Sequence, residues 1–315
     1  MPRPWEDSLK RSSSNSKRFW LASFVTALAL SGCAVSQKHT VAPGQVRPAL
    51  SATQAQLVAA YNDQAQKIRT VNASVRMSPV AGSAYSGVIQ EYHEVGGFIL
   101  AARPALIRII GQAPVVATNI FDMVSDGITF RIFIPSKNKF LVGPAELDRP
   151  SNNAIENLRP QHILDALFWP DIAADETVLF EEFDASPSRY YVLTVVRNAG
   201  ANPEIARKIW FDRADLRIAR VEIFGPAGRL DSDINYSDWE PLPAAPTSGP
   251  GAPQASAMLF PREIRVSRPL QDYELTVEVT KLALNTDIAA DRFTLEQPSG
   301  TELVNVAPVG RETQP

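Results

Sequence analysis

The feature that most constrains this chain is a strict alternation of apolar and polar residues. Residues 71–77 (VNASVRM) place Val, Ala, Val and Met at alternate positions, and residues 273–280 (YELTVEVT) repeat the pattern with Tyr, Leu and two Val. Successive side chains of a β-strand point to opposite faces of a sheet, so each segment buries one face and leaves the other in water. The alternation predicts a mainly β protein.

Similar segments recur along the chain and are separated by short turn sequences such as 125–127 (SDG) and 225–228 (GPAG). Short turns join neighbouring antiparallel strands, and a sheet of about a dozen strands usually curls or closes. We therefore expect one strongly curved antiparallel sheet. Besides the two segments above, the predicted strands cover 84–95, 97–102, 105–111, 116–123, 128–134, 140–142, 177–182, 189–197, 206–212, 216–224, 230–238 and 258–267.

A helix is predicted ahead of the first strand. Residues 51–54 (SATQ) have the spacing of a capping box, and Leu57, Tyr61, Ala65 and Ile68 then recur on one helical face. This helix leads into the sheet.

A second helix is predicted in residues 160–170 (PQHILDALFWP), since one proline suits a helix start and the other ends it. The segment has more apolar surface than a short surface helix needs. It is either an ordinary helix packed on the sheet or a lid across the mouth of the curved sheet. As a lid, its lipid-binding residues would be Ile163, Leu164, Leu167, Phe168 and Trp169.

The N-terminus has the pattern of a secretory signal. A net-positive segment, 1–18, precedes an apolar run, 19–30, and the small residues Ser31 and Gly32 lead to Cys33, the only cysteine of the chain. The apolar run is shorter than the roughly 20 residues that a membrane-spanning helix needs.

The residues at the end of this signal, 30–33 (LSGC), resemble the bacterial lipobox. The resemblance implies that residues 1–32 are a lipoprotein signal peptide and that Cys33 carries a covalent diacylglycerol and an N-acyl chain, of which palmitate is typical. Ala34 at the next position favours the outer membrane. The alternative is a general secretory signal with a cysteine near its end by chance.

The remaining chain divides into a tether, a domain and a tail. Residues 33–50 are a polar tether and 307–315 are a tail, with one domain in 51–306 between them. Residues 241–254 contain five prolines and two glycines, which favour neither helix nor strand. Because strand patterns flank this stretch, we interpret it as a loop within the domain.

Charge and cysteine content exclude some functions. The signal contains five basic and two acidic residues, so the rest of the chain has 26 basic and 32 acidic residues and a net charge of −6. Such a chain lacks the basic surface that nucleic-acid binding needs. With its one cysteine acylated, the chain has no thiol for catalysis or metal binding.

Two further stretches, 209–229 (IWFDRADLRIARVEIFGPAGR) and 291–306 (DRFTLEQPSGTELVNV), resemble the LolA/LolB lipoprotein-carrier superfamily. The opening helix followed by 70–77 (TVNASVRM) is similar to the start of that family. The resemblance implies a half-open barrel with a leading helix and a short helical lid, whose concave face binds acyl chains of lipids or lipoproteins. The lipobox aligns the chain with LolB, the lipid-anchored member, rather than with the soluble carrier LolA.

No motif for catalysis is present: the chain has no Gly-rich phosphate loop, G-x-S-x-G elbow or HExxH. Glu91, His93 and Glu94 could form part of a metal site, but solvated residues of a surface strand are the favoured interpretation. We expect His162 and Asp165 to form a surface pair. The sequence predicts no enzyme, no metal and no cofactor other than the lipid on Cys33.

Two functions follow, both for a lipoprotein of the bacterial envelope that faces the periplasm. The first is a module that binds acyl chains or lipoproteins in a concave apolar groove and takes part in their transfer. The second is a structural or signalling lipoprotein that uses the same fold, with a filled interior, to bind a protein partner. A periplasmic hydrolase ranks below both, since only scattered carboxylates support it.

Overall fold

The computed structural model describes residues 48–83, 88–91, 93–113, 118–145, 159–185, 188–199, 202–242 and 258–306. Cys33, the predicted signal peptide, the tether up to residue 47, most of the Pro-rich loop and the tail lie outside the described residues.

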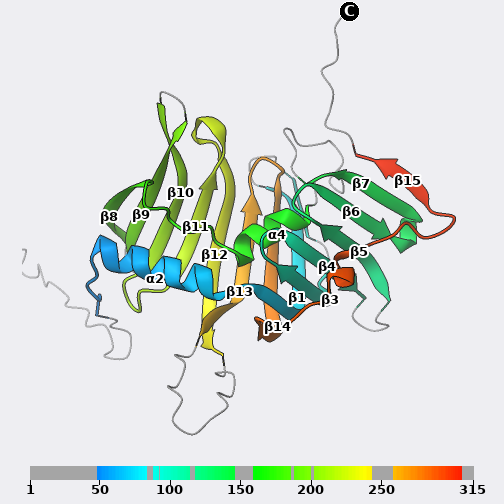
Figure 1. Cartoon of the computed structure of the whole chain (residues 1–315), viewed down its shortest axis with the longest axis horizontal. Helices are drawn as coiled ribbons and strands as arrows, with labels where there is room; N and C mark the ends of the chain where they lie inside the picture. The colour runs from blue at the N-terminus through cyan, green and yellow to red at the C-terminus, as the bar shows by residue number, and fades with distance from the viewer. Residues whose placement is uncertain are drawn as a thin grey trace, which may run out of the picture. The chain divides into compact units, whose positions relative to one another are not determined.

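The strands of the described residues form a single sheet of fifteen strands, drawn in Figure 1. Their order in the sheet is β15-β7-β6-β5-β4-β3-β1-β14-β13-β12-β11-β10-β9-β8, and β2 pairs with β1. The strands are β1 (Thr70–Ser83), β2 (Val88–Glu91), β3 (Val95–Ala102), β4 (Leu106–Gln112), β5 (Asn119–Ser125), β6 (Thr129–Ile134), β7 (Lys139–Pro144), β8 (Thr177–Ala185), β9 (Ser188–Ala199), β10 (Asn202–Asp212), β11 (Ile218–Phe224), β12 (Leu230–Pro241), β13 (Leu259–Arg268), β14 (Tyr273–Leu284) and β15 (Glu302–Asn305).

The sheet consists of two meanders that β1 joins. Strands β3 to β7 form one meander and β8 to β14 the other, each with antiparallel neighbours. Strand β1 pairs with β3 on one side and β14 on the other, so that Val71 lies between Ala101 and Leu284. Strand β15 pairs with β7 in parallel, the one departure from the expected antiparallel order among the described strand pairs.

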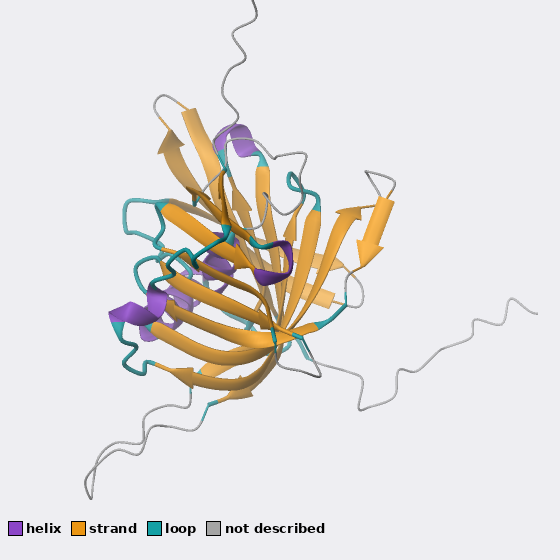
Figure 2. Ribbon diagram, turned by 90° about the vertical axis from the view of Figure 1, so that its right-hand side faces the viewer, coloured by secondary structure: helices purple, strands orange, loops and turns teal. Residues whose placement is uncertain are grey.

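The sheet is curved and unclosed, because its two terminal strands, β8 and β15, do not pair with each other. The two α-helices in the described part of the chain lie on its inner side, as Figure 2 shows from a second direction. The expected half-open barrel with a leading helix is confirmed.

The leading helix, α2 (Gln54–Lys67), buries Leu57, Tyr61 and Ala65 on the face that the sequence predicts. Its N-cap is Thr53 rather than Ser51, because the Thr53 hydroxyl accepts from the Gln56 amide and the Gln56 side chain accepts from the Thr53 amide. The capping box therefore begins two residues later than the expected one.

The second helix, α4 (Pro160–Leu167), packs against β4, β5 and β13. It begins with Pro160 at its first turn, as predicted, and the chain leaves it at Phe168. No helix in the described part of the chain is long and apolar enough to span a membrane.

Several strand predictions differ from the structure in their bounds. Of the expected strand 84–95, residues 84–87 and 92 lie outside the described residues, and β2 covers Val88–Glu91. Strand β1 extends to Ser83, where it pairs with β2. The predicted alternation of β1 holds throughout, with Val71, Ala73, Val75 and Met77 buried.

Candidate functional site

A cavity of about 310 Å³ lies between the sheet and the first turn of α4. Most of its wall is apolar, and five polar residues also line it. The apolar residues are Met77, Pro79, Val80, Ala81, Val95, Phe121, Met123, Ile163, Val266, Tyr273 and Leu275. The polar residues are Lys137, Arg159, Gln271, Asp272 and Glu274.

The alternation explains only part of this wall. On β1, Met77, Pro79 and Ala81 occupy every second position, but the residue between the last two also lines the cavity. On β14, Tyr273 and Leu275 have the same spacing, and the residue between them again lines the cavity as well. Strands far apart in the sequence thus turn their apolar faces toward one interior. The period of two defines the inward face, and the structure shows that part of it borders a cavity.

The five predicted lid residues divide into two groups. All are buried, but only Ile163 lines the cavity. All five belong to the packed core, so Ile163 is the member of the core that also borders the cavity. The short helix therefore closes one end of the cavity and fills the interior next to it.

Trp169 lies in a packed aromatic cluster. Its ring stacks on Tyr61 with centroids 5.9 Å apart and meets Tyr236 edge-on at 5.5 Å. Trp169 Nε1 donates to the Tyr236 hydroxyl at 2.7 Å, and that hydroxyl donates to the Ala166 carbonyl at 3.0 Å. Burial raises the pKa of Tyr236, which stays a neutral donor. The interior beneath Trp169 is thus filled.

Arg103, in the turn between β3 and β4, ties the two helices together. Its guanidinium donates to the carbonyls of Ala65 and Ile68 at the end of α2 and to that of Trp169 after α4, at 2.9 to 3.0 Å. It also lies over the ring of Phe168, 5.0 Å from the centroid. Carbonyls at helix ends lack intrahelical donors, so a cation suits this position.

His162 connects α4 to the wall of the cavity. The expected surface pair with Asp165 is wrong for this side chain, because His162 is buried and its Nδ1 forms a 2.5 Å hydrogen bond with the Tyr273 hydroxyl. Burial and the guanidinium groups of Arg268 and Arg159 lower the pKa of His162 well below its usual value. The imidazole is therefore neutral at pH 7, and burial raises the pKa of Tyr273.

Arg159 brings a buried cation to the cavity. It caps the start of α4, its Nε donates to the Pro144 carbonyl at 3.1 Å, and its guanidinium lies 4.0 Å from the centroid of the Phe130 ring. Lys137 reaches the cavity from the η2 turn (Pro135–Lys137) and is exposed.

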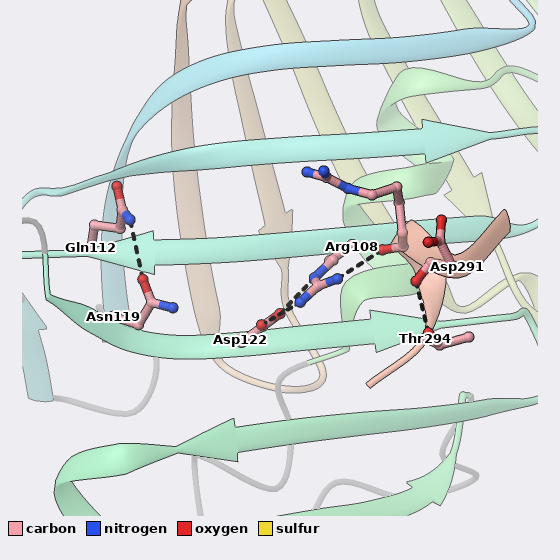
Figure 3. A network of polar contacts seen from close by, with 7 residues as sticks. Arg108, Gln112, Asn119, Asp122, Asp291 and Thr294 are labelled. Atoms are coloured by element: carbon pink, nitrogen blue, oxygen red, sulfur yellow. Dashed lines mark hydrogen bonds and ion pairs between the residues drawn. The ribbon is translucent and has the colours of Figure 1, made fainter. Parts of the chain in front are cut away.

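The polar contacts on the outer face are structural. Figure 3 shows Arg108 of β4 bound to Asp122 of β5, with its Nη2 2.7 Å from Oδ2 and its Nε 3.0 Å from Oδ1. Arg108 Nη1 also donates to the Arg292 carbonyl at 3.0 Å, which holds the η4 turn (Ala290–Phe293) against β4.

Within the described part of the chain, no group of three His, Cys, Asp or Glu side chains is placed to hold a metal ion. Glu91, His93 and Glu94, which the sequence suggested as part of a metal site, are all exposed.

Comparisons with known proteins found similarity only among solved structures. No protein-family model matches the chain, and no curated protein matches it. The structural neighbours include a DUF1329 family protein from Desulfovibrio piger, which is 13% identical, with a TM-score of 0.48, over 75% of this chain and 94% of that one.

Two other neighbours have titles that name lipoprotein-related groups. A LolA superfamily protein from Nitrosomonas europaea is 12% identical, with a TM-score of 0.43, over 76% of this chain and 97% of that one. A domain described as an outer membrane lipoprotein-sorting protein from Vibrio parahaemolyticus is 9% identical, with a TM-score of 0.44, over 75% and 95%. These similarities concern the arrangement of strands and assign no ligand.

Proposed function

We propose that this chain is a membrane-anchored lipoprotein of the bacterial envelope that faces the periplasm and binds acyl chains of lipids or lipoproteins. The cavity beneath the start of α4 holds the acyl chain, and the chain acts by binding and transfer rather than by catalysis.

The observation that carries this proposal is the apolar cavity. Its volume of about 310 Å³ reaches the range of small-molecule sites, roughly 300–1,000 Å³. Each methylene that leaves water contributes about 0.8 kcal/mol. Two methionines, Met77 and Met123, belong to the wall, and their flexible side chains adapt to chains of different shape. The second hypothesis requires a filled interior, so the cavity favours lipid binding.

The anchor is proposed from the lipobox alone, since Cys33 lies outside the described residues. Its test is metabolic labelling with radioactive palmitate. The wild-type chain should incorporate label and fractionate with outer membranes, and Cys33→Ser should do neither. Label that persists in the variant would contradict acylation at this residue.

Lipid binding is tested on the full chain purified from cells in detergent. After exchange into buffer with a fluorescent fatty acid, the wild type should show saturable binding with one site per chain. Native mass spectrometry should show an acyl-chain ligand that organic solvent removes. No saturable binding together with no extractable lipid would refute the proposal.

A matched pair of variants locates the site. Ala81→Trp places an indole in the cavity, whereas Ala283→Trp adds the same group to an exposed position of β14. We expect Ala81→Trp to weaken fatty-acid binding at least about tenfold, since the loss of only two buried methylenes already costs about 1.6 kcal/mol. Ala283→Trp should bind as the wild type does. Equal affinities for the two variants would place the ligand elsewhere.

A further inference from the structure

The edge strand β8 differs from the opposite edge of the sheet. It is nine residues long and pairs with β9 alone among the described strands, whereas the other terminal strand, β15, has four residues. A long edge strand presents a row of unpaired backbone groups to which another chain can add.

Some of the usual protections of an edge are missing from β8. Its sequence, TVLFEEFDA, has no proline, lysine or arginine, although it has three acidic residues. Leu179, Phe180 and Phe183 are 59%, 37% and 44% exposed. Two of these side chains, Leu179 and Phe183, lie on the same face of the strand and offer a partner an apolar contact there.

The backbone of β8 is open along its outer side. Gln54 Nε2 donates to the Val178 carbonyl at 3.1 Å, near the start of the strand. From Leu179 to Asp184, the only backbone hydrogen-bonding partners among the described residues are those of β9.

The two faces of β8 carry different side chains. Phe180 turns inward to the buried Tyr191, with centroids 5.3 Å apart. Leu179, Glu181 and Phe183 therefore alternate on the outer face. There Phe183 meets Trp210 edge-on at 5.2 Å.

The acidic side chains of β8 are not equivalent. Glu182 forms an ion pair with Arg213 at 2.8 Å. Glu181 is exposed and has no hydrogen bond or ion pair with any described residue. The outer face thus presents an unpaired carboxylate between two apolar side chains.

We propose that β8 is a docking strand for an extended segment of a partner protein, which adds to the sheet with a lysine or arginine opposite Glu181 and apolar residues opposite Leu179 and Phe183. A second copy of this chain is disfavoured, since full antiparallel pairing of two β8 strands sets Glu181 against itself. This function is independent of lipid binding.

The test uses the full chain in detergent micelles and a fluorescent seven-residue peptide, Thr-Leu-Thr-Lys-Thr-Leu-Thr, capped at both ends. Fluorescence anisotropy should show saturable binding to the wild type. Glu181→Lys should weaken it by about fivefold or more, and a peptide with glutamate in place of lysine should bind this variant better than the wild type. Asp287→Lys makes the same charge change at an exposed residue after β14 and should leave binding unchanged.

Four results would overturn the proposal. The first is the absence of saturable binding to the wild type, and the second is equal affinity of the peptide for Glu181→Lys and Asp287→Lys. The third is equal binding of a peptide that is N-methylated throughout, which would show that the backbone takes no part. The fourth is a dimer of the wild type that Leu179→Lys abolishes, which would show that a second copy occupies the edge.

Discussion

Single polar residues on and after α4 attach the helix to the sheet. His162 bonds to Tyr273 on β14, and Trp169 bonds to Tyr236 on β12. Both bonds are buried, where a polar group that loses its partner is costly. These two buried bonds therefore help to hold α4, whose first turn closes one end of the cavity.

The neutral state of His162 predicts a pH dependence of stability. In the unfolded chain this imidazole is protonated below about pH 6.5, whereas in the native state its pKa is lowered by burial and by Arg268 and Arg159. The unfolded state thus binds a proton that the native state does not. The free energy of unfolding should fall from pH 7 to pH 5 with a slope approaching 1.4 kcal/mol, roughly, per pH unit.

Urea unfolding at pH 7, 6 and 5 measures this slope. His162→Asn keeps an acceptor for Tyr273 and should flatten the dependence. His93→Asn, at an exposed position, should preserve it. Identical slopes for the two variants would mean that other groups cause the pH dependence.

Trp169→Phe tests the aromatic cluster. The substitution leaves space in the core and removes the donor to the Tyr236 hydroxyl. We expect the free energy of unfolding to drop by about 2–4 kcal/mol. Trp210→Phe, at a half-buried residue of the outer face, should cost only about 1 kcal/mol. Chemical denaturation compares the two, and a smaller loss for Trp169→Phe would contradict its central place in the core.

At the scale of elements, α2 and α4 are held as a pair rather than separately. Arg103 bonds to carbonyls at the ends of both helices. Asn62 of α2 also bonds twice to Ile172, beyond α4, at 2.8 and 2.9 Å. The His162–Tyr273 bond holds the first half of α4 to the sheet, and the Arg103 contacts hold the chain just after the helix.

Arg103→Lys should loosen this connection. A lysine cannot reach three carbonyls at once, so we expect a loss of about 2–3 kcal/mol of unfolding free energy. Amide hydrogen exchange should rise in residues 160–169. Arg131→Lys changes an exposed arginine of β6 and should alter neither quantity. Unchanged exchange in Arg103→Lys would show that α4 is held by packing alone.

At the scale of the whole molecule, β1 connects the two meanders, because it pairs with one strand of each. Ala73 is buried and lies between Ile99 of β3 and Leu282 of β14. Because β1 pairs with β14, which lies far along the chain, the fold depends on contacts distant in the sequence.

Proline substitutions test this arrangement. Ala73→Pro disrupts pairing in a central strand, and we expect at least about 3 kcal/mol of destabilisation, enough to broaden or abolish the cooperative transition. Gln90→Pro, in the exposed four-residue strand β2, should shift the melting temperature only slightly. Thermal unfolding followed by circular dichroism separates the two. A cooperative, wild-type-like transition for Ala73→Pro would refute the central role of β1.

Much of the fold was predictable from local pattern. The period of two in 71–77 and 273–280 identified the inward faces of β1 and β14, and the apolar spacing after residue 54 identified α2. The cap of α2 and the limits of β2 were wrong, because several residues near an element end satisfy the same rule and tertiary contacts choose among them.

The candidate site was predictable only in part. The sequence placed Ile163, Leu164 and Leu167 on a helix that covers the sheet, and all three are buried. Alternation shows which side chains share a face but not how far apart two faces lie. It therefore did not distinguish Ile163, which borders the cavity, from Trp169, which fills the interior.

The sequence by itself determined a mainly β chain with a leading helix, since backbone geometry links residue spacing to side-chain direction. Only the tertiary structure decided that β1 joins two meanders, that Arg103 connects the two helices and that a cavity remains beneath α4. These features depend on distances between residues far apart in the chain. They are fixed when curvature and packing bring the strands together, and no local pattern encodes them.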